Sequence, residues 1–287
     1  MSAVIVIRSQ PVKHEEIDFT SRSNSSCDRW LQYYGLDIFK IVNFVTEFML
    51  TSSHPLKQVF HCPEESDFYA HCLESLVLNA SDPSRLIVEF GSGEGSPVIK
   101  SLLRTDFDGK IQGFELNKVA CKIAESQIKE YELSEQYTVN NCSFFDSPLY
   151  QSADCVISNP PYLPAVDDKI YQPLLHGGSD GCTIAKKLLS LGCDEVLLMV
   201  SSYSNPVGLI DYALDRGYSV ANFEIAPLNF GYYSSEPKVK SAIATLREQG
   251  MAFYSENIYL LAGVLFKKQQ KSQRDLSIEL IQLMTAF

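Results

Sequence analysis

The chain has 287 residues, of which 45% are hydrophobic and 21% charged, a composition that predicts a globular protein with a substantial core. Its formal net charge is −11, the wrong sign for broad electrostatic binding to nucleic-acid phosphates, although a local basic groove remains open. The eight cysteines form no Cys-x-x-Cys pair, and no histidines are paired at ligand spacing, so no metal is expected and reduced thiols are favoured. The apolar run Ala3–Ile7 is too short for a signal-peptide core and no stretch approaches a membrane span, so we expect a cytoplasmic protein with no membrane partner.

Residues 1–80 are predicted to form a mainly helical extension in front of a catalytic domain at residues 81–287. The polar stretch Thr20–Ser26 has the composition of a linker. Apolar side chains then recur at helical spacing from Trp30 to Leu50, which predicts an amphipathic helix. A second helix is expected from Glu64 or Glu65 to Leu78, and the two helices together predict a helical N-terminal unit.

From Leu86 onward, strand-like apolar runs alternate with helical periodicity, which predicts an α/β fold with a parallel, doubly wound, Rossmann-like sheet. Seven strands are expected, at Leu86–Phe90, Lys110–Phe114, Tyr137–Asn140, Ala153–Ile157, Glu195–Ser201, Tyr218–Ile225 and Asn257–Phe266. Helices are expected at Ser96–Leu103, Lys118–Tyr131, Thr183–Leu191, Val207–Arg216 and near the C-terminus. The segment Gly231–Gln249 includes a further helix, Lys238–Glu248, and is predicted to be an insertion beside the functional site.

A glycine-rich turn, Gly91-Ser92-Gly93-Glu94-Gly95, joins the first of these strands to a helix. Glycines let the backbone approach a ligand closely. A dinucleotide site has the spacing G-x-G-x-x-G with pyrophosphate at the helix N-terminus, whereas the spacing here is G-x-G-x-G and Glu94 would repel a phosphate. A nucleoside with a charged amino-acid tail fits better, and S-adenosylmethionine is such a ligand. Glu115, at the end of the next strand, is expected to hold its two ribose hydroxyls.

A second motif, Asn159-Pro160-Pro161-Tyr162, follows the strand Ala153–Ile157. The two prolines remove two N–H donors and stiffen the backbone, which therefore presents carbonyl acceptors. The Asn159 side-chain oxygen and the Pro160 carbonyl can each accept a hydrogen from a planar NH2 group, while Tyr162 stacks on that group. Alone, this motif is as consistent with a proline turn, but after the glycine turn it indicates a site that makes a weak nitrogen nucleophile attackable.

With both motifs, the sequence resembles the class I S-adenosylmethionine-dependent methyltransferases, in the amino-group branch that includes the HemK/PrmC release-factor glutamine methyltransferases and the N6-adenine methyltransferases. The resemblance covers Val59 to Phe266 and implies a seven-stranded methyltransferase sheet with S-adenosyl-L-methionine as cofactor. It implies catalytic roles for Asn159, Pro160, Pro161 and Tyr162. It implies donor binding by Glu89, Gly91, Ser92, Gly93, Glu94, Gly95, Glu115, Ser143, Phe144 and Asn159, although Ser143 replaces the family's usual Asp.

The substrate is narrowed by two further features. One is Gly177-Gly178-Ser179-Asp180-Gly181, which is similar to the Gly-Gly-x-Asp-Gly segment of the glutamine methyltransferases. The other is the segment Pro63-Glu64-Glu65-Ser66, which also favours these enzymes over the N6-adenine methyltransferases. The same glycine segment matches a hydrolase elbow, but every histidine precedes Ser179, so the required chain order fails. We expect methylation of a glutamine amide in a protein substrate. The alternatives are an exocyclic amine of RNA or DNA, and an inactive member that binds the donor or a partner without turnover.

Overall fold

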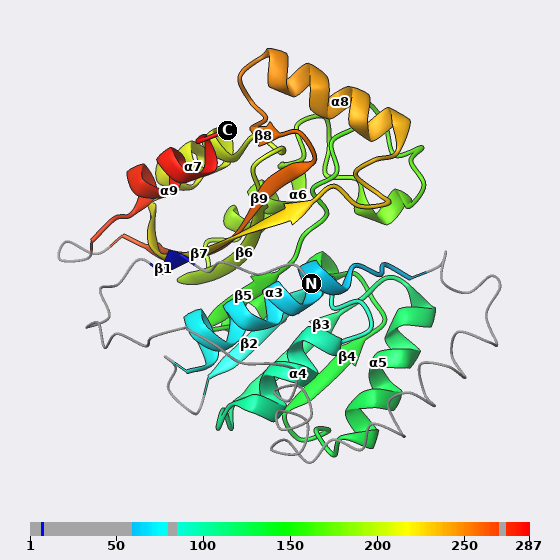
Figure 1. Cartoon of the computed structure of the whole chain (residues 1–287). Coiled ribbons are helices and arrows are strands. Elements are labelled where there is room, and N and C mark those ends of the chain that lie inside the picture. The colour runs from blue at the N-terminus through cyan, green and yellow to red at the C-terminus, as the bar shows by residue number, and fades with distance from the viewer. Residues whose placement is uncertain (1–6, 9–58, 80–84, 270–273) are drawn as a thin grey trace, which may run out of the picture. The chain divides into compact units, whose positions relative to one another are not determined.

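The computed structural model describes residues 7–8, 59–79, 85–269 and 274–287, which belong to one compact unit (Figure 1). The predicted linker Thr20–Ser26 and the predicted helix Trp30–Leu50 lie outside the described residues, so the helical extension over residues 1–80 stays a prediction. Within the described ranges, no helix is long and apolar enough to cross a membrane.

The strands of the described part form one mixed sheet. They are β1 (Ile7–Arg8), β2 (Leu86–Phe90), β3 (Lys110–Phe114), β4 (Tyr137–Asn140), β5 (Cys155–Ser158), β6 (Glu195–Ser201), β7 (Tyr218–Asn229), β8 (Tyr254–Ser255) and β9 (Ile258–Lys268). Their order is β1-β7-β9-β6-β5-β2-β3-β4, and β8 pairs with β9. Strands β2 to β6 are mutually parallel, as predicted. The prediction of a parallel sheet is wrong for β9, which is antiparallel to β6 and to β7 because it forms a hairpin-like pair with β7. The seven predicted strands are confirmed, and β1 and β8 are short additions to them.

Strand β7 is longer than predicted, because its pairing with β9 continues from Tyr218 to Asn229 instead of ending at Ile225. Pro227 lies inside this pairing, although proline cannot donate a hydrogen bond to a neighbouring strand. Strand β1 pairs with β7 only at Glu224 and Ile225, so Pro227 lies beyond the end of β1. At this edge position no second described strand requires an N–H donor, and the lack of one in proline is tolerated.

Helices cover both faces of the sheet. One face carries α3 (Pro63–Leu73), the π-helical turn η2 (Glu74–Leu78), α4 (Ser96–Arg104) and α5 (Lys118–Glu130), and the other carries α6 (Thr183–Leu189), α7 (Pro206–Asp215) and α9 (Ser277–Met284). Figure 1 shows α3, α4 and α5 in a row and α7 beside α9. Alternate residues of one strand enter the two cores, as Ile87 and Val88 do, because side chains point to opposite faces of a sheet.

Helix α8 (Pro237–Glu248) confirms the predicted helix of the insertion, and it adds Val239, Ile243 and Leu246 to the core on the α3 side. The predicted helix to Leu78 begins at Pro63 but changes from α-helical to π-helical geometry at Glu74. Three 3-10 turns complete the described elements: η3 (Phe144–Asp146), η4 (Pro148–Ser152) and η5 (Pro173–Leu175).

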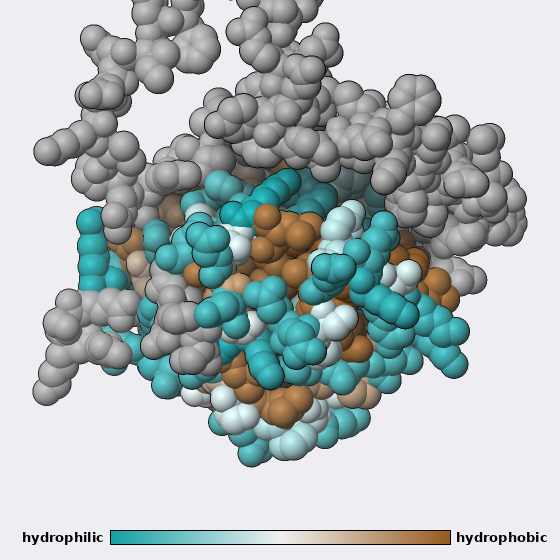
Figure 2. Space-filling model, turned by 90° about the horizontal axis from the view of Figure 1, so that it is seen from below, coloured by the Kyte–Doolittle hydropathy of each residue, from teal (hydrophilic) through white to brown (hydrophobic). Residues whose placement is uncertain are grey.

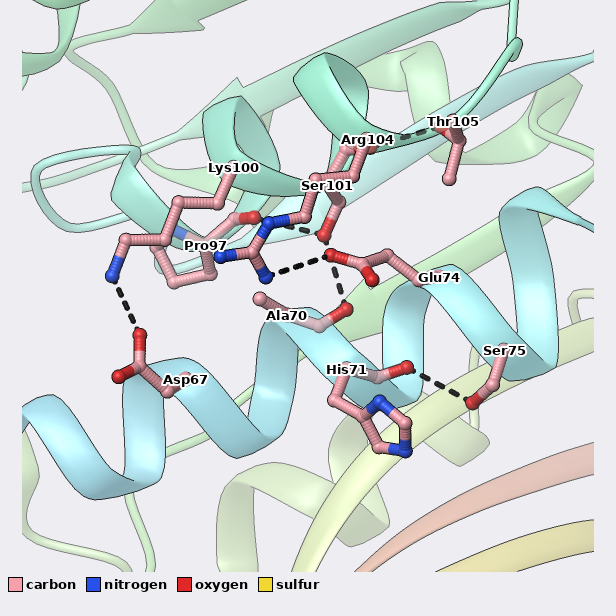
Figure 3. Close-up of polar contacts among 10 residues, drawn as sticks. All are labelled: Asp67, Ala70, His71, Glu74, Ser75, Pro97, Lys100, Ser101, Arg104 and Thr105. Carbon is pink, nitrogen blue, oxygen red and sulfur yellow. Dashed lines mark hydrogen bonds and ion pairs between the residues drawn. The ribbon is translucent and has the colours of Figure 1, made fainter. Parts of the chain in front are cut away.

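Helix α3 is attached to α4 by polar contacts that Figure 3 displays. The hydroxyl of Ser101, which is fully buried, donates to the Ala70 carbonyl at 3.0 Å. Lys100 pairs with Asp67 at 2.6 Å at the surface, where an ion pair contributes little stability. Because α4 begins at the glycine turn, these contacts place the first turn of α3 beside that turn.

The molecular surface is mixed in character. Figure 2 shows one face on which hydrophobic residues gather in groups among hydrophilic ones. Apolar atoms supply more than half of the accessible surface of most folded proteins, so such groups alone do not identify a binding surface. The polar side chains that meet at the carboxyl ends of the parallel strands are a better guide to a functional site.

Candidate active site

A cavity of about 350 Å³ lies at the carboxyl ends of β2 to β5, where the loops after these parallel strands meet. This volume suits a small-molecule ligand. The structure brings most of the predicted site residues together around it: Glu89, Gly91, Ser92, Gly93, Glu94, Glu115, Ser143, Phe144, Asn159, Pro160, Pro161 and Tyr162. Gly95 instead caps the N-terminus of α4.

The glycine turn has a backbone that only glycine adopts without strain. Gly91, Gly93 and Gly95 have φ values of +70°, +55° and +79°, in the left-handed region that residues with a Cβ avoid. The G-x-G-x-G spacing therefore follows from three positive φ angles in one turn. The N–H groups of Gly91 and Ser92 both donate to the Phe114 carbonyl, which holds the turn against the end of β3.

Glu115 ties the glycine turn to the start of α5. Its Oε2 accepts a hydrogen bond from the Gly93 N–H at 2.8 Å, and its Oε1 accepts one from the Asn117 N–H at 2.6 Å. A carboxylate offers about four acceptor positions, so these two bonds leave capacity for two further donors. The side chain is half-buried in the cavity wall, and this arrangement can hold a pair of ligand hydroxyls.

Glu89 is a buried carboxyl at the inner end of the cavity, with an exposed fraction of 1%. Tyr137 and Tyr69 donate hydrogen bonds to its two oxygens, at 2.7 and 3.2 Å. Burial nevertheless raises the pKa of Glu89 to about 7, because removal from water disfavours the charged form more than the two hydroxyls favour it. A cation bound in the cavity would favour the ionised carboxylate.

Aromatic side chains line the part of the cavity after β4. The ring of Phe144 is buried between Phe90 and Phe114, with edge-on contacts at 5.6 and 5.4 Å between ring centroids. Ser143 precedes it and is half-buried in the same wall. Phe144 is thus a core residue as well as a cavity residue. Such a wall can pack against a planar base, with the Ser143 hydroxyl as a polar neighbour.

The Asn-Pro-Pro-Tyr loop is supported from behind by the second glycine segment. A Cβ at Gly177 would lie 2.7 Å from the Tyr162 Cα and 2.8 Å from the Pro161 carbonyl oxygen, so only glycine allows this approach. Asp180 holds the segment in place, because its Oδ2 accepts hydrogen bonds from Lys186 at 2.9 Å and from Asn205 at 3.0 Å. The Gly-Gly-x-Asp-Gly pattern therefore has a structural explanation in its contact with the loop.

The Asn159 side chain presents an unused acceptor. Its Oδ1 is buried and has no hydrogen-bond partner among the described residues, which is an unfavourable state for a polar atom unless a ligand completes it. Tyr162 is also buried, and its hydroxyl donates to Glu65 on α3. Tyr259 on β9 donates to the other oxygen of the same carboxyl at 2.8 Å.

Phe60, Tyr232 and Tyr233 add further aromatic side chains to the cavity lining, and Tyr171 packs against Tyr232 from outside this lining. The ring centroids of Tyr171 and Tyr232 are 5.3 Å apart, and those of Phe60 and Tyr233 are 5.5 Å apart. The N–H of Tyr171 donates to Glu236 at 2.6 Å, which joins the loop after β5 to the predicted insertion. The insertion thus lies beside the site, as predicted, and it contributes Gly231–Ser234 to the lining.

Several residues of the site escaped sequence reasoning. Glu65, Tyr69, Tyr137 and Tyr259 contact predicted residues only through tertiary structure, and each has an ordinary position in a helix or strand pattern. Of these four residues, only Glu65 lies in a segment that the sequence analysis singled out, Pro63–Ser66. Among the described residues, no group of three or more His, Cys, Asp or Glu side chains is placed to hold a metal ion.

Comparison with known proteins gives partial matches, and no protein-family model matches the chain. It is 27% identical over 113 residues to the release factor glutamine methyltransferase of Gloeobacter violaceus, covering 36% of this chain and 39% of the relative. It is 31% identical over 120 residues to the corresponding enzyme of Dictyoglomus turgidum, covering 37% and 40%. It is 29% identical over 115 residues to the ribosomal protein uL3 glutamine methyltransferase of Francisella tularensis, covering 37% and 36%. The match therefore spans about two fifths of the length of these relatives.

A solved structure of geranyl diphosphate C-methyltransferase from Streptomyces coelicolor, in complex with Mg2+, geranyl diphosphate and S-adenosyl-L-homocysteine, is similar in fold. Its TM-score is 0.44 at 10% sequence identity, covering 72% of this chain and 80% of that one.

Proposed function

We propose that this protein, which has the class I methyltransferase fold and is distantly related to protein glutamine methyltransferases, is an S-adenosylmethionine-dependent N-methyltransferase that acts on a planar NH2 group. The buried, unpartnered Oδ1 of Asn159 is the observation that carries this proposal. An acceptor oxygen of this kind is completed by an N–H donor, and it lies in the same cavity as the glycine turn.

The residues around the cavity suit the methyl donor. When bound, S-adenosylmethionine supplies an electrophilic sulfonium methyl group. Glu115 has acceptor capacity left for the two ribose hydroxyls, and the wall at Ser143 and Phe144 suits the adenine. The backbone of the Gly91–Gly95 turn would hold the methionine part, and the carboxyl of Glu89 would favour its cationic ammonium group.

Catalysis then rests on orientation of the acceptor nitrogen. Asn159 Oδ1 and the Pro160 carbonyl each accept one hydrogen of the NH2 group, which aims the nitrogen at the methyl group and weakens its delocalisation. A new N–CH3 bond forms as the sulfonium S–CH3 bond breaks, and one N–H proton is released from the product. No strong base is needed for this step, because the proton leaves after the nitrogen has become positively charged.

A glutamine amide in a protein is the acceptor that we favour. The curated relatives are glutamine methyltransferases that act on release factors or on ribosomal protein uL3. The basic residues Lys267 and Lys268 lie where β9 meets the start of β6, at the opposite end of the parallel strands from the cavity. Lys267 is also paired with Glu195 at 2.6 Å. These charges are poorly placed to hold nucleic-acid phosphates near Asn159.

Label transfer from methyl-labelled S-adenosylmethionine into a cell lysate tests the proposal. Label that disappears with protease and survives nuclease supports a protein acceptor, whereas label lost to nuclease alone would identify an exocyclic amine of RNA or DNA. Asn159→Ala should abolish transfer, while Asn257→Ala, on an exposed turn, serves as the matched control. Absence of transfer by the unmodified protein, with the donor bound, would identify an inactive family member.

A further inference from the structure

Glu236 is a buried carboxylate that forms no ion pair with any described residue. It precedes α8 in the insertion, and its exposed fraction is 6%. Its Oε2 accepts a hydrogen bond from the Tyr171 N–H at 2.6 Å, but its side chain forms no capping bond with α8. Its Oε1 has no hydrogen-bond partner in the described part of the chain, and it is not among the fully enclosed atoms that lack one, so it keeps access to solvent. A carboxylate in this state is unfavourable unless a cation completes its environment.

Two exposed aromatic rings lie beside this carboxylate. Tyr171 and Tyr232 are 54% and 62% exposed, and their ring centroids are 5.3 Å apart. Tyr171 is joined to Glu236 by the hydrogen bond of its N–H. Tyr232 is four positions before Glu236, in a segment that turns back because the Glu236 N–H donates to the Tyr233 carbonyl at 3.3 Å. The face of a tyrosine ring attracts a lysine or arginine side chain, so the rings and the carboxylate favour the same kind of ligand.

The two rings lie on the side of the cavity where the acceptor is expected. Tyr232 lines the cavity, and so does Leu174, which is 47% exposed. The segment that carries Leu174 is paired with the residue after the Asn-Pro-Pro-Tyr motif, because the Leu163 N–H donates to the Leu175 carbonyl at 3.2 Å. A chain that places a side chain at Asn159 can therefore place a neighbouring residue against the two rings.

Lysines on the adjoining segments do not neutralise Glu236. Lys238 is paired with Asp167, and its Nζ also donates to the Lys169 carbonyl at 3.3 Å. The side chains of Lys169 and Lys240 are exposed, and neither forms an ion pair in the described ranges. The carboxylate is thus available to a cation from another molecule.

We propose that Glu236, Tyr171 and Tyr232 form a recognition site for a lysine or arginine side chain of the substrate protein, near its acceptor glutamine. The cationic group lies against the exposed ring faces with its charge toward Oε1 of Glu236, while the glutamine amide enters the cavity. A nucleic-acid phosphate would be repelled by the carboxylate, so the site favours a protein ligand. This inference rests on the proposed function, because it requires a protein acceptor, and it adds the chemistry of a second substrate residue.

Variants of Glu236 and Tyr232 test the site through the dependence of transfer on substrate concentration. Glu236→Gln removes the charge but keeps an oxygen that can accept the Tyr171 N–H, and Tyr232→Ala removes a ring. At saturating donor, both should raise the lysate protein concentration that gives half-maximal transfer by about fivefold or more, with the maximal rate within about twofold. Tyr232→Phe, which keeps the ring, should restore most of the affinity. Tyr131→Ala is the matched control, because Tyr131 is 48% exposed at the end of α5.

Chemical blocking of the lysine and arginine side chains of the lysate proteins tests the charge directly. At low lysate concentration, the unmodified protein should methylate the blocked lysate about fivefold more slowly than the untreated lysate. Glu236→Gln should methylate the two lysates at rates within about twofold of each other, because it lacks the carboxylate that distinguishes them.

Two results would overturn the inference: an unchanged half-maximal concentration in Glu236→Gln, or an equal loss of transfer to blocked lysate in Glu236→Gln and the unmodified protein. A lower maximal rate together with a lower melting temperature in Glu236→Gln and Tyr232→Ala would show a structural role and would overturn it too. The Kd for S-adenosylhomocysteine should not change in these variants. Label that is lost to nuclease alone, or transfer by Asn159→Ala, would instead overturn the proposed function itself.

Discussion

Glu89→Gln should change how the stability of the protein depends on pH. The pKa of Glu89 is raised from its ordinary value of 4.5 to about 7, because the carboxyl is 1% exposed and loses its hydration on folding. The folded protein therefore binds this proton more tightly than the unfolded chain does. The stability linked to Glu89 is fully present below about pH 4.5 and is lost as the pH rises through about 7.

The magnitude follows from the size of the shift. A rise of one pKa unit corresponds to about 1.4 kcal/mol, so most of a total near 3 kcal/mol should be lost between pH 5 and pH 8. Glutamine cannot ionise and has a similar size, and it can still hydrogen bond with Tyr69 and Tyr137. The free energy of unfolding of the unmodified protein should thus fall by about 2 to 3 kcal/mol relative to that of Glu89→Gln over this range.

Urea denaturation of both proteins at pH 5 and pH 8, followed by circular dichroism, measures this difference directly. Other buried carboxyls, such as Glu65, titrate in both proteins and cancel in the comparison. Parallel pH dependence of the two proteins would refute the reasoning, because it would mean that Glu89 is ionised in the folded state with an ordinary pKa.

The remaining predictions concern the donor and the loop. S-adenosylmethionine and S-adenosylhomocysteine, but not NAD, should raise the melting temperature, with about 2.7 kcal/mol of stabilisation at a hundredfold excess over Kd. Glu115→Ala should weaken this effect, whereas Glu130→Ala, on the exposed side of α5, should not. S-adenosylhomocysteine should bind more tightly as the pH rises through about 7, and calorimetry should show this dependence reduced in Glu89→Gln. Gly177→Ala should lower the melting temperature and abolish transfer, because its Cβ would meet backbone atoms at 2.7 Å; Gly192→Ala, a control with a positive φ and no close neighbour, should leave transfer unchanged.

Much of the fold could be predicted because the parallel strands are short apolar runs with clear boundaries. Leu86–Phe90 ends at a glycine, Lys110–Phe114 follows one closely, and both strands have the predicted bounds. The extension of β7 to Asn229 could not be predicted locally, since its only cause is pairing with β9. The direction of β9 between β6 and β7 likewise depends on contacts between distant parts of the chain.

The candidate site shows the same division. The glycine turn and the Asn-Pro-Pro-Tyr loop carry local signals, because positive φ angles require glycine and consecutive prolines restrict the backbone. Glu65 belongs to the Pro63–Ser66 segment that the sequence analysis singled out, but its contacts with Tyr162 and Tyr259 could not be predicted, because these partners are 97 and 194 positions away in the chain. Phe144 was predicted as a donor contact, and its place in the hydrophobic core became visible only through its packing on Phe90 and Phe114.

The most direct test of the central claim is chemical identification of the methylated product. Labelled lysate protein from reactions with the unmodified protein and with Asn159→Ala is digested enzymatically to amino acids and analysed by mass spectrometry. The proposed function predicts glutamine methylated on its side-chain nitrogen with the unmodified protein and none with Asn159→Ala. A methyl group on another amino acid, or equal amounts of methylglutamine from both proteins, would contradict it.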